Sequence, residues 1–311
     1  MDAVTKVVTD SFIKQLQSTE KLPWEVPYLY HNAFGYMSKH TYTGINRWLV
    51  PFGEYFTRKG ITDYNEENGT NYKFAKGIKW YPILYYGDSI KEISVDSLPD
   101  EVKASYNRTL NTPQKVQIAS TYGGKIRYYE ENGKIFKHSP VRRYYRVADR
   151  THFVDDNGNC PPSRLGNGLH IEYARPDSLA DMAIRRLALN KVLGTRFHFD
   201  AQSRTITVAD SKYCPSEWFY YFHLFRVIAQ ATKLVFRQNS NLDARQEECI
   251  CLVTAGLLCA ESNVCDKHGT ILDPDKKNYS FQGWVDYFDN NKDKIIGIMH
   301  EADKAYNYIL G

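Results

Sequence analysis

The sequence has no apolar run that could cross a membrane and no export signal. None of its 311 residues belongs to a stretch of the roughly 18 to 20 apolar residues that a membrane span requires, and the mean hydropathy is −0.53. The start, MDAVTKVVTDSFIKQLQ, lacks a basic segment followed by an apolar one, unlike a signal peptide. We therefore expect a cytoplasmic protein without membrane contacts.

The signatures of common enzyme classes are also missing. There is no P-loop, no GxGxxG after a strand, no GxSxG and no CxxC pair. The nine histidines are scattered, with no HxH or HxxxH spacing. The sequence therefore predicts no cofactor and no catalytic residue.

Cysteines are few, and four of the six fall between 249 and 265, in a segment typical of a helix and its exit. Cys249 and Cys251 are two residues apart, so on a helix they point about 200° apart and cannot bind one metal ion. We expect buried, reduced thiols in a reducing compartment rather than a zinc site.

The composition is that of a folded protein rich in tyrosine. Apolar residues make up 42% and charged residues 24%, and there are 24 Tyr against 15 Phe and 5 Trp. The length suggests two domains. The segment 155–168, DDNGNCPPSRLGNG, is typical of a linker, so we predict domains at 1–154 and 169–311.

Periodicity predicts an α+β protein. In the first half we expect a helix at 4–18, strands at 79–86, 116–122 and 142–148, and a hairpin that turns at Asn132-Gly133. In the second half we expect a helix at 176–193, a hairpin of 196–199 against 205–208, and helices at 216–236, 243–261 and 292–310.

Positive charge is concentrated in the first half. From Lys103 to Arg150 there are 11 Lys/Arg against 3 Asp/Glu, whereas 156–311 has 18 basic and 19 acidic residues. This distribution is expected of a surface that meets a polyanion. An ordinary solvated face is the alternative that charge alone leaves open.

Basic and aromatic residues alternate in three segments of this half. Single-stranded DNA binding needs cations for the phosphates and rings on which bases stack. The interleaved residues that we predict to bind are Lys73, Lys76, Lys79, Trp80, Arg127, Arg142, Arg143 and Tyr145. The alternative is a tyrosine-rich, half-buried sheet with solvated basic edges. No recognition-helix motif indicates sequence-specific reading.

The predicted helix at 216–236 has a stripe of apolar residues and, beside it, a polar line. The line consists of His223, Arg226, Gln230 and Lys233. A polar line on a largely apolar helix faces a cleft, a partner or another polar group. A hydrogen-bonded internal network explains it equally well.

Several segments, in this order, resemble the plasmid antirestriction ArdC family. They are PWEVPYLYHNAFGYMSKHTYTGINRWLV, NGTNYKFAKGIKWYPILYY, VRRYYRVADRTHF and YSFQGWVDYFDNNKDKIIGIMHEADKAYNYIL. The resemblance implies an N-terminal single-stranded DNA-binding domain and a C-terminal zincin-like domain with a His-Glu-x-x-His helix. It adds Tyr42 and Asn46, from the Y-x-G-I-N motif, to the predicted binding residues.

The sequence departs from this family at the metal helix. Arg226 and Gln230 stand where the resemblance implies the ligand histidines, and Val227 stands in place of the general-base glutamate. A guanidinium cannot bind a metal cation, and valine cannot accept a proton. We therefore expect a pseudo-metallopeptidase without metal, in which Arg226 pairs with Glu247 or Glu248 of the next helix.

The sequence thus predicts a single-stranded DNA-binding accessory protein of a phage or mobile element. The resemblance implies that it protects entering DNA from host restriction, and the C-terminal domain is expected to contact protein or DNA. Two alternatives stay open. One is a hydrolase with an unorthodox site at His223, Glu247 and Glu248. The other is a structural or cargo protein of a virion.

Overall fold

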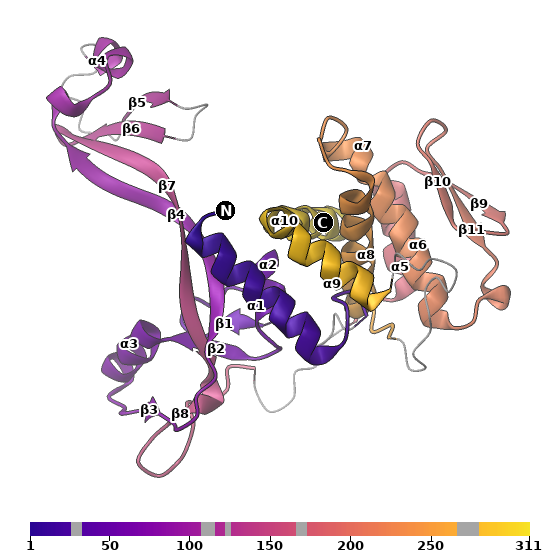
Figure 1. Cartoon of the computed structure of the whole chain (residues 1–311), viewed down its shortest axis with the longest axis horizontal. Coiled ribbons are helices and arrows are strands. Elements are labelled where there is room, and N and C mark those ends of the chain that lie inside the picture. Colours follow the sequence, from indigo (N-terminus) through magenta and orange to yellow (C-terminus); the bar gives the residue numbers. More distant parts are fainter. Residues whose placement is uncertain (26–32, 107–115, 122–125, 166–172, 266–279) are drawn as a thin grey trace. The chain divides into compact units, whose positions relative to one another are not determined.

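The structure is a computed structural model that describes residues 1–25, 33–106, 116–121, 126–165, 173–265 and 280–311 (Figure 1). The described chain divides into two compact units, Met1–Ile83 with Arg146–Gly311, and Leu84–Tyr145. The predicted boundary at 155–168 stays a prediction. Its described part, 155–165, includes a turn in which the Asp155 carboxylate accepts hydrogen bonds from the backbone of Asn157 and Asn159. Helices and strands occur together, and the predicted α+β class is confirmed.

The first helix packs on the last ones. Helix α1 (Ala3–Thr19) confirms the helix expected from the i, i+4 apolar repeat, and it buries Val8 and Phe12. The Asp2 side chain caps its first turn. The Phe12 ring lies 5.4 Å from Phe288 of α9 (Phe281–Asn290). Helix α1 also packs on α10 (Lys292–Leu310). The two ends of the chain therefore share one core.

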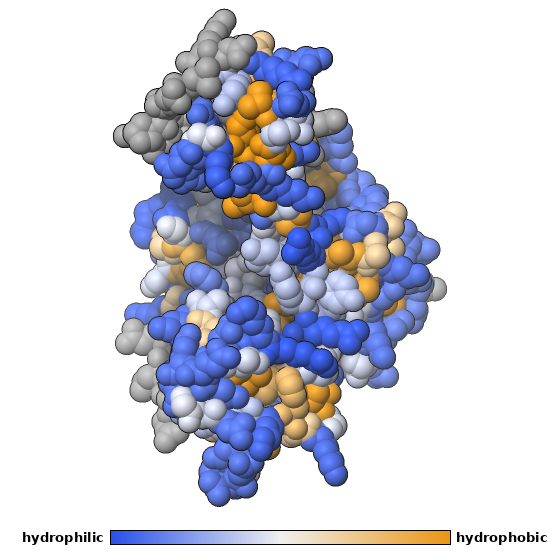
Figure 2. Space-filling view, turned by 90° about the vertical axis from the view of Figure 1, so that its left-hand side faces the viewer, coloured by the Kyte–Doolittle hydropathy of each residue, from blue (hydrophilic) through white to orange (hydrophobic). Residues whose placement is uncertain are grey.

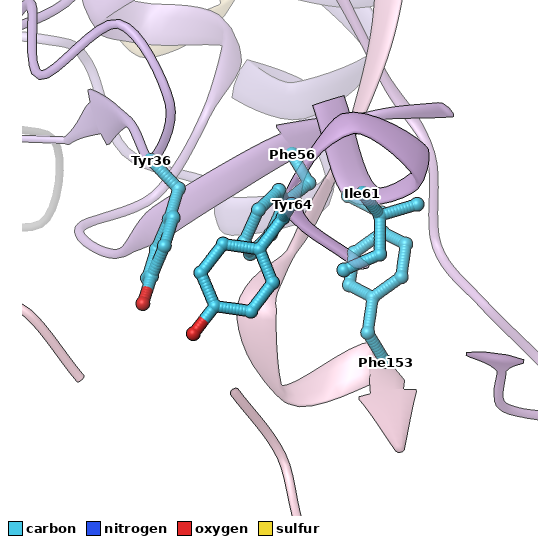
Figure 3. Close-up of a cluster of buried hydrophobic side chains, with 6 residues drawn as sticks. Tyr36, Phe56, Ile61, Tyr64 and Phe153 are labelled. Atoms are coloured by element: carbon cyan, nitrogen blue, oxygen red, sulfur yellow. The ribbon is translucent and has the colours of Figure 1, made fainter. Parts of the chain in front are cut away.

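Short elements from two segments of the chain, 34–74 and 150–154, build a second core. They are β1 (Phe34–Gly35), β2 (Glu54–Thr57), α3 (Arg58–Asn68), β3 (Lys73–Phe74), η3 (Arg150–His152) and β8 (Phe153–Val154). Helix α2 (Ile45–Leu49) follows β1 in the sequence but packs on α1 and α10. Strand β2 pairs parallel with β1, and β3 pairs antiparallel with β8. Figure 3 shows the side chains that fill this core, which include Tyr36, Phe56, Ile61, Tyr64 and Phe153.

The second unit is a strand-rich hairpin structure. Its elements are β4 (Tyr81–Ile93), η2 (Val95–Ser97), α4 (Asp100–Tyr106), β5 (Val116–Thr121), β6 (Ile126–Glu131) and β7 (Lys134–Asp149), of which β4 and β7 extend into the first unit. The predicted turn is confirmed, because Asn132 and Gly133 have φ of 53° and 72° between β6 and β7. The separate strand predicted at 142–148 is wrong. Those residues continue β7, which runs through Ser139 and Pro140 without interruption from Lys134 to Asp149.

In the C-terminal part, helix α8 packs on both α6 and α10. The elements of this part are α5 (Pro176–Arg186), β9 (Asn190–Gly194), β10 (His198–Asp200), β11 (Thr205–Ala209), η4 (Ser211–Tyr213), α6 (Glu217–Ala231), α7 (Lys233–Phe236) and α8 (Ala244–Glu261). The predicted hairpin and the helices predicted at 243–261 and 292–310 are confirmed. The single helix predicted at 216–236 is interrupted at Thr232, where α6 ends and the short α7 begins. The helix predicted at 176–193 is too long, because Asn190–Gly194 pairs with β11 as a parallel strand and Ala188 turns the chain with φ of 50°.

Helix α8 is the most buried element of the C-terminal part. A Cβ on its Gly256 would lie 2.7 Å from the Cα of Trp24, so only glycine allows the two backbones this contact. Cys249, Cys251 and Cys259 are buried as expected, but Cys265 is exposed because it follows the helix end. Among the described residues, no helix is long and apolar enough to span a bilayer.

Candidate functional site

Two rings and a guanidinium form an exposed surface in the first unit. The Arg58 guanidinium, at the start of α3, lies 5.7 Å from the Phe74 ring and 5.2 Å from the Trp80 ring. The two ring centroids are 5.7 Å apart, and Phe74 is 49% exposed. We call Arg58, Phe74 and Trp80, with the neighbouring Lys76 and Lys79, the 74/80 surface.

Strand pairing explains why Phe74 keeps one face free. Phe74 pairs with Phe153 in the β3–β8 ladder, and their rings lie 5.5 Å apart, so one side of Phe74 covers the core. Exposed lysines lie along the same segment: Lys73 pairs with Asp156 at 2.7 Å, and the Lys79 ammonium lies 4.8 Å from the Tyr81 ring. Lys76 is exposed in a turn with Gly77, which has a φ of 74°.

A second exposed aromatic group lies on strands β4 and β7 of the other unit. The Tyr85 and Tyr145 rings are 5.4 Å apart, and 47% and 41% of these residues are exposed. Tyr86 is exposed as well, as are Arg142 and Arg143. Successive strand residues point to opposite faces, so both faces of this stretch are accessible. We call Tyr85, Tyr86, Arg142, Arg143 and Tyr145 the 85/145 ribbon.

Three predicted binding residues are held in other ways. Arg127 pairs with Asp88 at 2.5 Å, which neutralises its charge locally. Tyr42 is mostly buried, its ring lies 6.1 Å from Tyr55, and burial raises the pKa of its hydroxyl. Asn46 lies in α2, which packs on α1 and α10. The structure does not bring Tyr42 and Asn46 into either aromatic surface.

The predicted binding residues did not include four members of these two surfaces: Arg58, Phe74, Tyr85 and Tyr86. Arg58 lies 16 residues before Phe74, and no spacing rule connects a residue at the start of a helix to rings of a later strand. Phe74 and Tyr85 could have been found, since each lies in an aromatic and basic segment. Figure 2 shows the hydropathy of one face, where hydrophobic side chains reach the surface in separate patches among hydrophilic ones.

Three of the four residues of the predicted polar line lie on α6, and the fourth, Lys233, is the first residue of α7. From Tyr221 to Ala231 only His223, Arg226 and Gln230 are not buried. The Arg226 Nη2 lies 2.7 Å from the Glu248 Oε1 of α8, so the expected ion pair with one of the two glutamates is formed. Val227 is buried in the core.

A second ion pair lies next to the first. The Arg237 Nε is 3.2 Å from the Glu247 Oε2, and the Lys233 Nζ is 3.7 Å from Glu247 Oε1. Arg237 is only 1% exposed, and its Nη2 also donates to the Ala229 carbonyl. Both carboxylates at the start of α8 are therefore paired with cations of α6, α7 and the residue that follows α7.

These residues do not fit a metal ion. In the part of the chain that the structure describes, no three His, Cys, Asp or Glu side chains are grouped so that they could hold one. The positions at 226 and 230 carry a guanidinium and an amide, and the His223 ring is packed against Phe219 and Phe197. A guanidinium offers hydrogens and no lone pair to a metal.

Comparison with known proteins shows the fold. No protein-family model matches the chain, and no curated protein does. The chain is similar to the metal-free crystal structure of the antirestriction protein ArdC from the R388 plasmid, with a TM-score of 0.63 and 16% sequence identity. The match covers 99% of this chain and 97% of that chain. The Mn(II)-bound form of that protein is similar with a TM-score of 0.61, 16% identity and coverage of 100% and 97%. The chain therefore has an ArdC-like fold over nearly its whole length, which confirms the resemblance at the level of the fold.

Proposed function

We propose that this protein binds single-stranded DNA without sequence preference and protects DNA that enters a host cell from restriction. The observation that carries the proposal is the 74/80 surface, where an exposed phenylalanine and a half-buried tryptophan lie beside Arg58. The exposed Lys76 and Lys79 lie in the same segment as the two rings. It is supported by the antirestriction protein of similar fold.

The chemistry of the 74/80 surface suits single strands. An unpaired base can stack on an exposed ring, and each such stack contributes about 1–3 kcal/mol. A base in a duplex has no free face for this contact. Cations beside the rings attract the phosphates of the same strand. Rings stack on any base, so this surface is expected to bind without sequence preference.

The 85/145 ribbon offers the same combination in the second unit. Tyr85, Tyr86 and Tyr145 expose rings, and Arg142 and Arg143 are exposed next to Tyr145. A two-faced strand pair gives bases access from either side. We propose that both surfaces contribute to DNA binding.

We also propose that the C-terminal part is not a metallopeptidase. Hydrolysis at a metal site needs a carboxylate near the metal-bound water, and the position that the family resemblance gives to it carries the buried Val227. The alternative hydrolase would use Glu247 and Glu248, but both carboxylates are engaged with arginines. That part is then expected to act as a platform for a protein or DNA contact.

Binding is tested by fluorescence anisotropy with labelled 20-nucleotide single strands and the matching duplex. We expect tighter binding of the single strand, weakening as NaCl is raised from 50 to 200 mM, since released counterions favour binding less at higher salt. Equal or absent binding to both DNAs at 50 mM would contradict the proposal.

Protection is tested in cells. A plasmid that carries unmodified restriction sites is transferred by conjugation into a host with the matching restriction enzyme, with and without the protein. We expect the wild-type protein to raise the number of transconjugants, and the Phe74→Ala/Trp80→Ala variant to fail. An equal rise with both proteins would show that the 74/80 surface is not the origin of protection.

A further inference from the structure

We propose that Arg226 is a built-in cation that takes over the structural task of a metal ion at helix α6. Its guanidinium holds Glu248 of α8 against α6, so the C-terminal helices are joined without metal and the site rejects divalent cations. This inference does not rest on DNA binding.

The contact is short and shielded. Arg226 Nη2 and Glu248 Oε1 are 2.7 Å apart, and the two side chains are 22% and 13% exposed. A buried carboxylate needs a positive partner, because removing it from water is costly. Arg226 is the residue that provides this partner for Glu248, and it bridges the two helices with the most extensive packing in the C-terminal part.

Glu247, the residue before Glu248 in α8, is also paired with cations. Glu247 is held by Arg237 and Lys233. Two carboxylates thus face three cations, and the cluster carries an excess of positive charge. A divalent ion that approached Glu247 or Glu248 would be repelled by like charges.

The orientation of the guanidinium groups excludes a metal for a second reason. Arg226 Nε and Arg237 Nη1 are buried and, within the described chain, accept or donate no hydrogen bond. Each nitrogen carries hydrogen and has no lone pair to offer. The buried interior around the two pairs therefore presents N–H groups where a metal centre would present lone pairs.

The test measures metal binding and thermal stability of the full-length chain. Wild type is unfolded by heat in EDTA and in MnCl2, and MnCl2 is titrated by calorimetry. The variants are Arg226→Met, Arg226→Lys, Glu248→Gln and the double variant Arg226→Met/Glu248→Gln. Lys59→Met, which breaks the exposed pair with Asp63, is the control.

We expect the same Tm in EDTA and MnCl2 for wild type, and no heat of Mn(II) binding. We expect Arg226→Met to lower the Tm by several degrees and Arg226→Lys to lower it much less. In the double variant we expect the Tm to recover more than half of the decrease seen with Arg226→Met. The single variant leaves the largely shielded Glu248 carboxylate without its Arg226 partner, whereas the double variant removes that negative charge.

Two results would overturn the proposal. One is stoichiometric Mn(II) binding by wild type, or a Tm that EDTA lowers; this measurement stands even where Arg226→Met does not fold. The other is an Arg226→Met or Glu248→Gln protein as stable as Lys59→Met, since the pair would then hold nothing together. Neither result bears on DNA binding, which is measured separately.

Discussion

Cations have different neighbours in two regions of the first unit. At α6–α8, Arg226 and Arg237 are paired with glutamates and largely shielded from water. At the 74/80 surface, Arg58 and Lys79 lie over aromatic rings and are exposed. Both regions contain basic side chains, but Arg226 and Arg237 connect helices, whereas Arg58 and Lys79 are exposed to solvent. The neighbours of a basic residue, more than the number of basic residues, indicate its role.

The largest expected effect comes from the shielded region. Arg237→Met removes the cation beside Glu247 at a position that is 1% exposed. Breaking a buried pair on one side costs about 3–5 kcal/mol, which urea unfolding would detect. The control is Lys212→Met, whose pair with Asp210 is exposed and screened by water, so little stability is expected to depend on it. An equal decrease in the free energy of unfolding of the two variants would contradict the expected difference between shielded and exposed cations.

A smaller effect is expected at the 74/80 surface. Phe74→Ala removes a stacking ring, so we expect the Kd for single-stranded DNA to rise about 5- to 150-fold, which corresponds to about 1–3 kcal/mol. Phe52→Ala is the matched control, since Phe52 is 43% exposed in the same unit and no cation of the described residues lies over its ring. Anisotropy measures both. Equal affinities of the Phe74→Ala and Phe52→Ala proteins for single-stranded DNA would contradict a role of the 74/80 surface in binding.

The 85/145 ribbon is expected to contribute less per ring. Tyr145→Ala removes a ring whose side is partly covered by Tyr85, so we expect a Kd increase of about 5-fold, at the lower end for one base stack. Tyr213→Ala is a strict control, because Tyr213 is 79% exposed and has Lys212 over its ring. Similar losses in both variants would mean that any exposed aromatic–cation pair binds DNA.

The smallest effect is expected from a single phosphate contact. Lys76→Gln leaves the rings in place and removes one exposed charge. On single-stranded DNA, the slope of log K against log[NaCl] is expected to become shallower by about 0.7. An unchanged slope, measured at five salt concentrations, would place Lys76 outside the DNA path.

Local signals predicted much of the fold. The i, i+4 repeat of α1, the Asn132-Gly133 turn and the long C-terminal helices depend on neighbouring residues and were predictable. The end of α5 at Arg186 was not, because the ladder between β9 and β11 outweighs the helical pattern of Leu187–Val192.

The candidate site was partly predictable for a similar reason. The Arg226–Glu248 pair could be expected, since helical spacing and the next helix start fix both residues. The contact of Arg58 with Phe74 and Trp80 joins distant segments, and the burial of Tyr42 depends on Tyr55, which no local pattern reveals.

The most direct test is photochemical crosslinking of the full-length protein to a single strand that contains 5-iododeoxyuridine, followed by peptide mapping. We expect crosslinks at Phe74, Trp80 and Tyr145, and none in the peptides that contain Arg226 and Arg237. Crosslinks confined to the α6–α8 peptides would contradict this expectation, because DNA would then contact the cations that we assign to ion pairs with Glu247 and Glu248.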